Sequence, residues 1–148
     1  MKKLLKISLC FMLWLLFILS PNITAQTQSD LDDTAHAEYQ KQDKMLNNTY
    51  KEILKIYKDD TLFINRLRIA QRAWLEYRDK YMESLYPEKD KSYYGSIYPM
   101  CYYNALALLT KQRADQLKLW LEGAEEGDGC SGSIKTKDAI KEIKNSIK

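Results

Sequence analysis

The chain contains no glycine and no proline between Pro21 and Pro87, and this absence limits its possible folds more than any other feature. Glycine and proline are the commonest residues at turns and helix ends. A long segment without them therefore favours long, uninterrupted helices. The five glycines all lie at Gly95 or later, and the third proline is Pro99. We expect an all-α fold.

Three main helices are predicted from apolar residues that recur every three or four positions. The first covers about residues 34–57, the second about residues 61–85, and the third begins near Pro99 and ends before Gly123. The predicted buried stripes are Tyr39, Leu46, Tyr50, Ile53 and Tyr57; Phe63, Leu67, Ala70, Trp74, Tyr77 and Tyr81; and Tyr103, Leu106, Leu109, Arg113, Leu117 and Trp120. The short first connection predicts antiparallel packing. The expected domain is a compact antiparallel array of three main helices.

Residues 1–25 have the three parts of a secretory signal peptide. Three lysines precede an apolar run at residues 7–19, and Ala25 is a small residue suited to cleavage. The run is shorter than the ~20 apolar residues that a membrane span needs. We expect export to the periplasm or beyond, with membrane contact only through the signal peptide. Residues 26–133 would form one helical domain, and residues 134–148 a basic tail whose isoleucine spacing fits a short helix.

The charge of the mature chain excludes no fold but disfavours one class of partner. Removing the three signal-peptide lysines from the 23 basic residues leaves 20, which equals the 20 acidic residues. Nucleic-acid binding needs a clustered surplus of Lys and Arg, so no nucleic-acid partner is expected. Acidic residues gather at residues 30–43 and 122–128. Each run is either an ordinary solvated surface or a region that steers a cationic partner.

The order of several short motifs is the most specific signal in the chain. They read D‑x‑x‑L‑N‑x‑x‑Y from Asp43, A‑Q‑x‑A‑W‑x‑x‑Y‑R‑D from Ala70, Gly95-Ser96, Cys101, and T‑x‑x‑R from Thr110. This order resembles the LprI-type lysozyme-inhibitor domain family over roughly residues 35–121. The resemblance implies a small helical domain exported by bacteria. It also implies binding to a protein partner, with a lysozyme-type muramidase as the candidate.

The same resemblance raises a question about the cysteines. Cys10 lies in the signal peptide, so Cys101 and Cys130 remain in a chain bound for an oxidising compartment. The family's usual partner of Cys101 lies just after the Y‑R‑D motif, where this chain has no cysteine. The resemblance therefore implies that Cys130 is the partner and that a disulfide tethers the C-terminal segment. The alternatives are two unpaired thiols or an intermolecular bridge.

Polar residues of the motifs share helix faces and have two interpretations. A structural polar network between helices would comprise Gln71, Trp74, Tyr77, Arg78, Asp79, Thr110 and Arg113. A recognition surface would draw on Asp43, Asn47, Tyr50, Tyr93, Tyr94, Glu125, Glu126 and Asp128. Tyrosine suits either role, because its ring packs while its hydroxyl reaches a polar partner.

Catalysis has little support in the sequence. The chain shows no nucleophilic triad, and His36 and the two remaining cysteines lack the spacing of metal ligands. We expect neither an enzyme nor a cofactor or metal. The predicted function is to bind and block a muramidase, with an acidic loop entering the cleft of the cationic enzyme. The alternative is an envelope accessory domain with an unrelated protein or glycan partner. The sequence does not indicate the oligomeric state.

Overall fold

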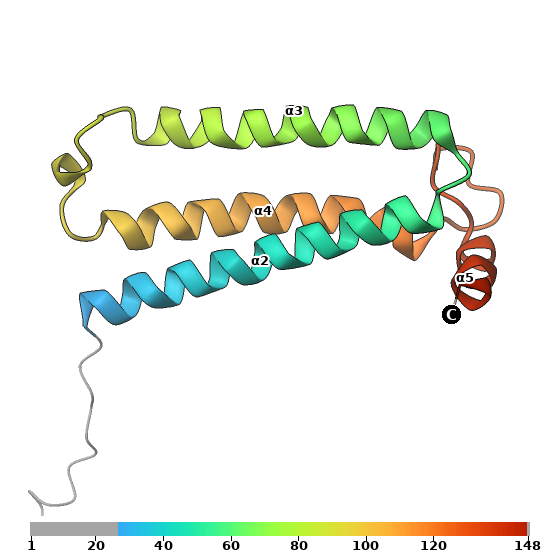
Figure 1. Cartoon of the computed structure of the whole chain (residues 1–148), viewed down its shortest axis with the longest axis horizontal. Coiled ribbons are helices and arrows are strands. Elements are labelled where there is room, and N and C mark those ends of the chain that lie inside the picture. Colours follow the sequence, from blue (N-terminus) through green and yellow to red (C-terminus); the bar gives the residue numbers. More distant parts are fainter. Residues whose placement is uncertain (1–26, 148) are drawn as a thin grey trace, which may run out of the picture.

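The computed structural model describes residues 27–147, which form four α-helices and one short 3-10 helix (Figure 1). In chain order these are α2 (Gln28–Ile56), α3 (Thr61–Leu85), η1 (Lys91–Tyr94), α4 (Tyr98–Glu122) and α5 (Lys137–Ser146). The all-α prediction is confirmed. The predicted signal peptide lies outside the described residues. Within residues 27–147, none of the helices combines the length and apolar character that a membrane crossing requires.

The first helix begins earlier than predicted, because its N-terminus is capped. The Thr27 hydroxyl accepts a hydrogen bond from the Asp30 backbone N–H, and the Asp30 carboxylate accepts one from the Thr27 N–H. This reciprocal capping box satisfies two backbone donors that the helix leaves free. The carboxylate of Asp30 also lies favourably near the positive end of the helix dipole.

Helices α2 and α4 run in the same direction and pack closely along their lengths, while α3 runs antiparallel to both (Figure 1). Small residues permit this close approach. Ala107, Thr110 and Ala114 are buried on α4, where the predicted stripe had placed Leu109 and Arg113. The predicted stripe on α4 is correct at Leu106 and Leu117, which are buried, and is one position off at Leu109 and Arg113. Larger side chains, among them Leu46 and Leu117, fill the rest of the seam.

Helix α3 lies further from α4 than α2 does (Figure 1). Ile64, Leu67 and Met82 are its buried residues. Between them, Gln71, Trp74 and Arg78 face inward and are half-buried, whereas Ala70, Tyr77 and Tyr81 are exposed. The predicted stripe on α3 is thus correct at Phe63, Leu67 and Trp74 and wrong at Ala70, Tyr77 and Tyr81. The antiparallel direction is confirmed, but the closest packing is confined to α2 and α4.

The predicted disulfide is wrong. Cys101 lies in the first turn of α4, and Cys130 lies beyond the last turn of that helix. The helix rises ~1.5 Å per residue, so its two ends are roughly 30 Å apart. A disulfide requires Cα atoms within ~7 Å of each other. Both cysteines are free thiols, half-buried at Cys101 and exposed at Cys130.

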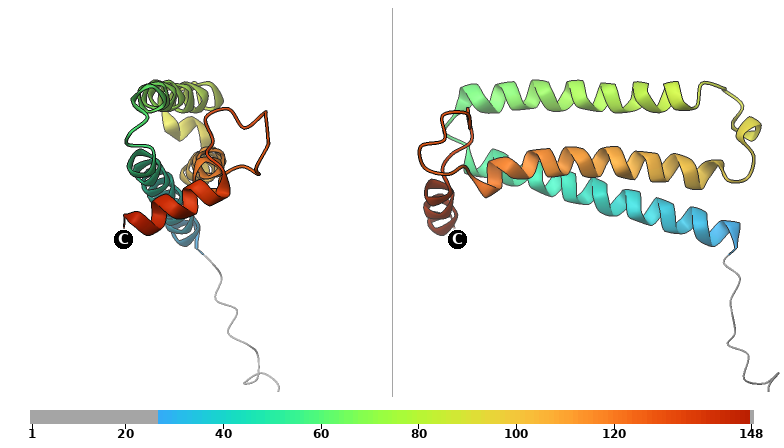
Figure 2. Two further views of the ribbon diagram at one scale, coloured as in Figure 1. Left: turned by 90° about the vertical axis from the view of Figure 1, so that its right-hand side faces the viewer. Right: turned by 180° about the vertical axis from the view of Figure 1, so that it is seen from behind.

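Hydrogen bonds hold the C-terminal segment where the disulfide was expected. The acidic loop, residues 124–136, is closed at its base by a parallel bridge between Ala124 and Thr136. The Ala124 N–H donates to the Lys135 carbonyl at 2.9 Å, and the Lys137 N–H donates to the Ala124 carbonyl at 3.0 Å. Helix α5 follows and lies across the end of the helix bundle (Figure 2). Its Ile140 is buried in the same core as the long helices.

Candidate functional site

A groove with a volume of about 420 Å³ lies between α2 and α3. We call it the α2/α3 groove. It is lined by Asp43, Leu46, Asn47, Tyr50 and Leu54 from α2, and by Arg68, Gln71, Arg72 and Leu75 from α3. Residues of the first sequence motif therefore face Gln71 of the second motif across this groove. Sequence reasoning grouped the α2 residues correctly by their spacing of four and three positions.

Residues on the α3 wall of the groove were missed. Arg68 and Arg72 are one helical turn apart and exposed, and Leu75 follows on the same flank. The spacing of four residues was visible in the sequence, but it does not reveal which flank of α3 faces α2. The flank that faces α2 depends on how α3 is rotated about its axis, and the predicted apolar stripe did not give this rotation correctly. On the opposite wall, the Asn47 amide donates to the Asp43 carboxylate at 2.8 Å.

The expected polar network divides into separate local contacts. The Arg113 Nε–H donates to the Gln71 Oε1 atom at 3.0 Å, which joins α4 to α3. Arg78 binds the adjacent Asp79 at 2.8 Å and lies over the Trp74 ring. The Thr110 hydroxyl donates within α4 to a backbone carbonyl, and Tyr77 is exposed beside Tyr81. The Gln71–Arg113 pair is therefore the contact between helices that these residues supply.

Arg113 is a half-buried cation between α3 and α4. Burial lowers the pKa of its guanidinium from the usual value, because desolvation disfavours the charged form. Its side-chain acceptors among the described residues are two neutral amides, Gln71 and Gln116. Neutral amides satisfy the N–H groups without adding a second buried charge. This geometry fixes α3 against α4 and thereby sets the position of the α2/α3 groove.

A tyrosine cluster anchors the connection between α3 and α4. Tyr86 lies edge-on to Tyr94 and Tyr98, with ring centroids 5.2 and 5.1 Å away. The Tyr94 hydroxyl accepts a hydrogen bond from the Glu88 N–H at 2.9 Å. Tyr94 is thus half-buried as a loop anchor, whereas Tyr93 is 75% exposed. Of the two tyrosines that sequence reasoning assigned to binding, Tyr93 presents the larger free surface.

The acidic loop lies at the opposite end of the molecule from the tyrosine cluster and projects sideways from the bundle (Figure 2, left). Glu125, Glu126 and Asp128 are all exposed. Glu125 forms a salt bridge with Lys137 at the start of α5. The Asp128 carboxylate accepts a hydrogen bond from the Cys130 N–H at 2.9 Å, which folds the loop tip back on itself.

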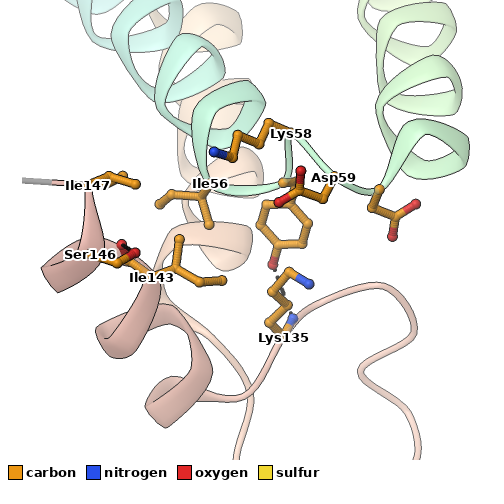
Figure 3. A pocket seen from close by; sticks show the side chains of 9 residues that line it. Ile56, Lys58, Asp59, Lys135, Ile143, Ser146 and Ile147 are labelled. Carbon is orange, nitrogen blue, oxygen red and sulfur yellow. Dashed lines mark hydrogen bonds between the residues drawn. The ribbon is translucent and has the colours of Figure 1, made fainter.

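Tyr57 and Trp120 join this loop to the long helices, and the Trp120 indole N–H donates to the Ser133 hydroxyl at 3.1 Å. Tyr57, which is 1% exposed, donates its hydroxyl hydrogen to the Trp120 carbonyl and accepts a hydrogen bond from the Lys135 N–H, both at 3.1 Å. Burial raises the pKa of the Tyr57 phenol above its usual value. Beside it lies a hollow of about 200 Å³, where Lys135 and Ile143 approach the end of α2 (Figure 3). The loop is therefore held in place by the helical core.

Metal binding finds no support in the part of the chain that the structure describes. No group of three His, Cys, Asp or Glu side chains there lies close enough to hold a metal ion.

The fold and these surfaces define a class of protein: a small all-α domain in which motif residues from two helices meet at a groove. The sequence profile of the family Lysozyme inhibitor LprI matches residues 20–117. The chain belongs to this family. The family comprises inhibitors rather than enzymes, and its domains are typically exported.

A second comparison finds a relative without an assigned function. The chain is 33% identical over 112 residues to the Uncharacterized protein R02472 of Rhizobium meliloti (strain 1021). The alignment covers 68% of this chain and 78% of that protein. No solved structure matches the chain.

Proposed function

We propose that the protein is an exported, lysozyme-inhibitor-like binding protein that blocks a muramidase by direct contact. Family membership supports the class of function, since the family is described by lysozyme inhibition. The contact element that we propose is the acidic loop, with Glu125, Glu126 and Asp128 as the interacting charges. Its partner would be the substrate cleft of a cationic muramidase.

The observation that carries this proposal is the shape of the loop. An enzyme cleft is concave, so the element that fills it must be convex, and the acidic loop projects from the bundle (Figure 2). The bridge at its base and the Tyr57 hydrogen bonds hold the loop before any partner arrives. A loop that is already ordered loses less conformational entropy on binding.

Charge supports the same choice of element. Glu126 and Asp128 form no salt bridge within residues 27–147. Glu125 pairs with Lys137, but exposed ion pairs contribute only about 0–1 kcal/mol, so this pair opens easily for a cationic partner. Exposed carboxylates on a projecting loop accelerate the encounter with a cation-rich surface.

The family profile ends before the acidic loop, which gives the proposal a competing surface. The matched residues contain the α2/α3 groove, and an inhibitor could use that face instead. The experiment therefore needs variants of both surfaces. The loop variant is Glu125→Gln/Glu126→Gln/Asp128→Asn, in which the side-chain amide introduced at position 128 keeps an oxygen that can accept from the Cys130 N–H. The groove variant is Asp43→Asn/Asn47→Ala.

A matched control separates the loop from net charge. Asp33→Asn/Glu52→Gln/Glu76→Gln removes the same charge from exposed positions on α2 and α3. Each protein, residues 26–148, is mixed with lysozyme while cell-wall lysis and association rates are followed at low and high ionic strength. The loop variant should associate at least about fivefold more slowly at low salt, with the difference shrinking as salt rises. The control variant should associate like the parent.

Three outcomes would contradict the proposal in different ways. Equal slowing in the loop and control variants would mean that net charge, rather than the loop, drives association. Loss of inhibition in the groove variant alone would place the contact on the α2/α3 groove. A parent protein that neither binds nor inhibits lysozyme would favour the envelope accessory domain instead.

A further inference from the structure

The α2/α3 groove contains two cations that the proposed inhibition does not use. Arg68 and Arg72 line it one helical turn apart. Within residues 27–147 neither forms a salt bridge. By contrast, Arg78 binds a carboxylate and Arg113 binds an amide. A pair of adjacent guanidiniums without protein partners suits a carboxylate ligand, because each can donate two parallel hydrogen bonds.

The rest of the groove restricts what else such a ligand must carry. Its floor is apolar, with Leu46 buried, Leu54 half-buried and Leu75 at the rim. On the α2 wall, one Asp43 oxygen accepts from the Asn47 amide. The second Asp43 oxygen and the Asn47 carbonyl oxygen are left as hydrogen-bond acceptors for a ligand. A matching ligand therefore combines a carboxylate, an apolar body and N–H donors.

We propose that the α2/α3 groove binds a short, extended peptide through a carboxylate held by Arg68 and Arg72. A peptide supplies all three features at once: backbone N–H donors for Asp43 and Asn47, an apolar side chain for the leucine floor, and a carboxylate. The volume of about 420 Å³ falls within the ~300–1,000 Å³ of typical ligand sites. The carboxylate is either the C-terminus of the peptide or an acidic side chain. This site is separate from the acidic loop and does not depend on muramidase binding.

Four probes test the chemistry. They are acetyl-Leu-Ala with a free C-terminus, acetyl-Leu-Ala amide, acetyl-Leu-Glu amide and inorganic phosphate. Binding to residues 26–148 is followed by calorimetry and by amide chemical-shift changes. The free acid should bind at least about tenfold more tightly than the neutral amide, since a charge-assisted contact is worth at least ~1.4 kcal/mol. The Glu-containing amide distinguishes a side-chain carboxylate from a C-terminal one, and binding of either form supports the proposal.

Variants of α3 supply the structural control. Arg68→Gln/Arg72→Gln should weaken binding of the tighter carboxylate peptide at least about tenfold, whereas Arg66→Gln should leave it unchanged. Arg66 is an exposed arginine on the same helix that does not line the groove. The proposal is overturned if neither carboxylate peptide binds more tightly than the neutral amide, if the two variants lose equal affinity, or if no peptide binds. Phosphate binding as tight as that of the peptides would replace it with a general anion site.

Discussion

Replacing Gly123 by alanine should loosen the whole C-terminal segment. Gly123 follows the last residue of α4 with φ 80° and ψ 161°, a backbone region that is essentially restricted to glycine. A side chain there costs about 1–3 kcal/mol in backbone strain alone. A Cβ atom would also lie 2.9 Å from the Lys137 Cα and N atoms and 3.1 Å from the Lys135 carbonyl oxygen.

These neighbours are backbone atoms at the start of α5, so they cannot move aside as a flexible side chain would. The bridge between Ala124 and Thr136 and the docking of α5 must shift instead. Overpacking of this kind typically costs another ~1–3 kcal/mol. The two effects together predict a loss of roughly 2–5 kcal/mol for Gly123→Ala.

Two other glycines of the same loop separate these effects. Gly127 has φ 82° but open space around a Cβ, so Gly127→Ala should cost only the backbone strain of about 1–2 kcal/mol. Gly129 has neither constraint, so Gly129→Ala should be neutral or stabilising by up to ~1 kcal/mol. Urea denaturation followed by circular dichroism gives the free energies of unfolding, and hydrogen exchange localises the loss. If Gly123→Ala costs no more than Gly127→Ala, the close approach of α5 to this turn is refuted.

Three further expectations follow from residues described above. In the monomer, Cys101 and Cys130 should both react with an alkylating reagent, Cys130 first because it is exposed, and Cys130→Ser should leave the melting temperature unchanged. If non-reducing peptide mapping finds the two cysteines joined, α4 is not one continuous helix. Trp74→Ala should cost about 2–3 kcal/mol in chemical denaturation, less than the roughly 3–5 kcal/mol of a fully buried tryptophan, and a loss below ~1 kcal/mol would place the ring in solvent. Tyr57→Phe should cost about 1–3 kcal/mol by removing two hydrogen bonds. Burial raises the pKa of Tyr57 in the folded state, so the stability that this phenol contributes is fully present below the unfolded-state pKa near ~10 and is lost as pH rises through the folded-state pKa. The Tyr57→Phe variant should therefore lose less stability than the parent at alkaline pH. Equal alkaline losses in the two proteins would contradict the burial of the phenol.

The helices were predictable from the sequence because turn-forming residues are absent from most of the chain. The faces that these helices bury were harder to predict. The prediction ranked positions by hydrophobicity, which favoured Leu109 over its neighbour Thr110. The structure buries Thr110 instead, because α2 and α4 approach too closely for a larger residue. Its hydroxyl is satisfied within the helix, so burial carries little cost.

The disulfide prediction failed for a geometric reason. Cys101 and Cys130 were paired because they are the two cysteines outside the predicted signal peptide. The continuous helix α4 separates them. The groove was predictable in part, since Asp43 and Asn47 share a face of any helix through them. Arg68 and Arg72 were not predicted as groove residues, because the rotation of α3 about its axis is set by tertiary packing.

The close seam between α2 and α4 has a consequence for how the chain folds. These parallel helices are not neighbours in sequence, since all of α3 and the tyrosine-rich connection lie between them. Packing α2 against α4, as where the Tyr57 hydroxyl meets the Trp120 carbonyl, therefore closes a long segment of chain, and contacts so distant in sequence form slowly. While the polypeptide is emerging, α2 can pack only against α3, where Phe63 lies beside Tyr57, until α4 follows and completes the core. The core of this topology is incomplete until nearly all of the chain is available, and a chain with an incomplete core costs less free energy to keep unfolded for passage through a narrow channel.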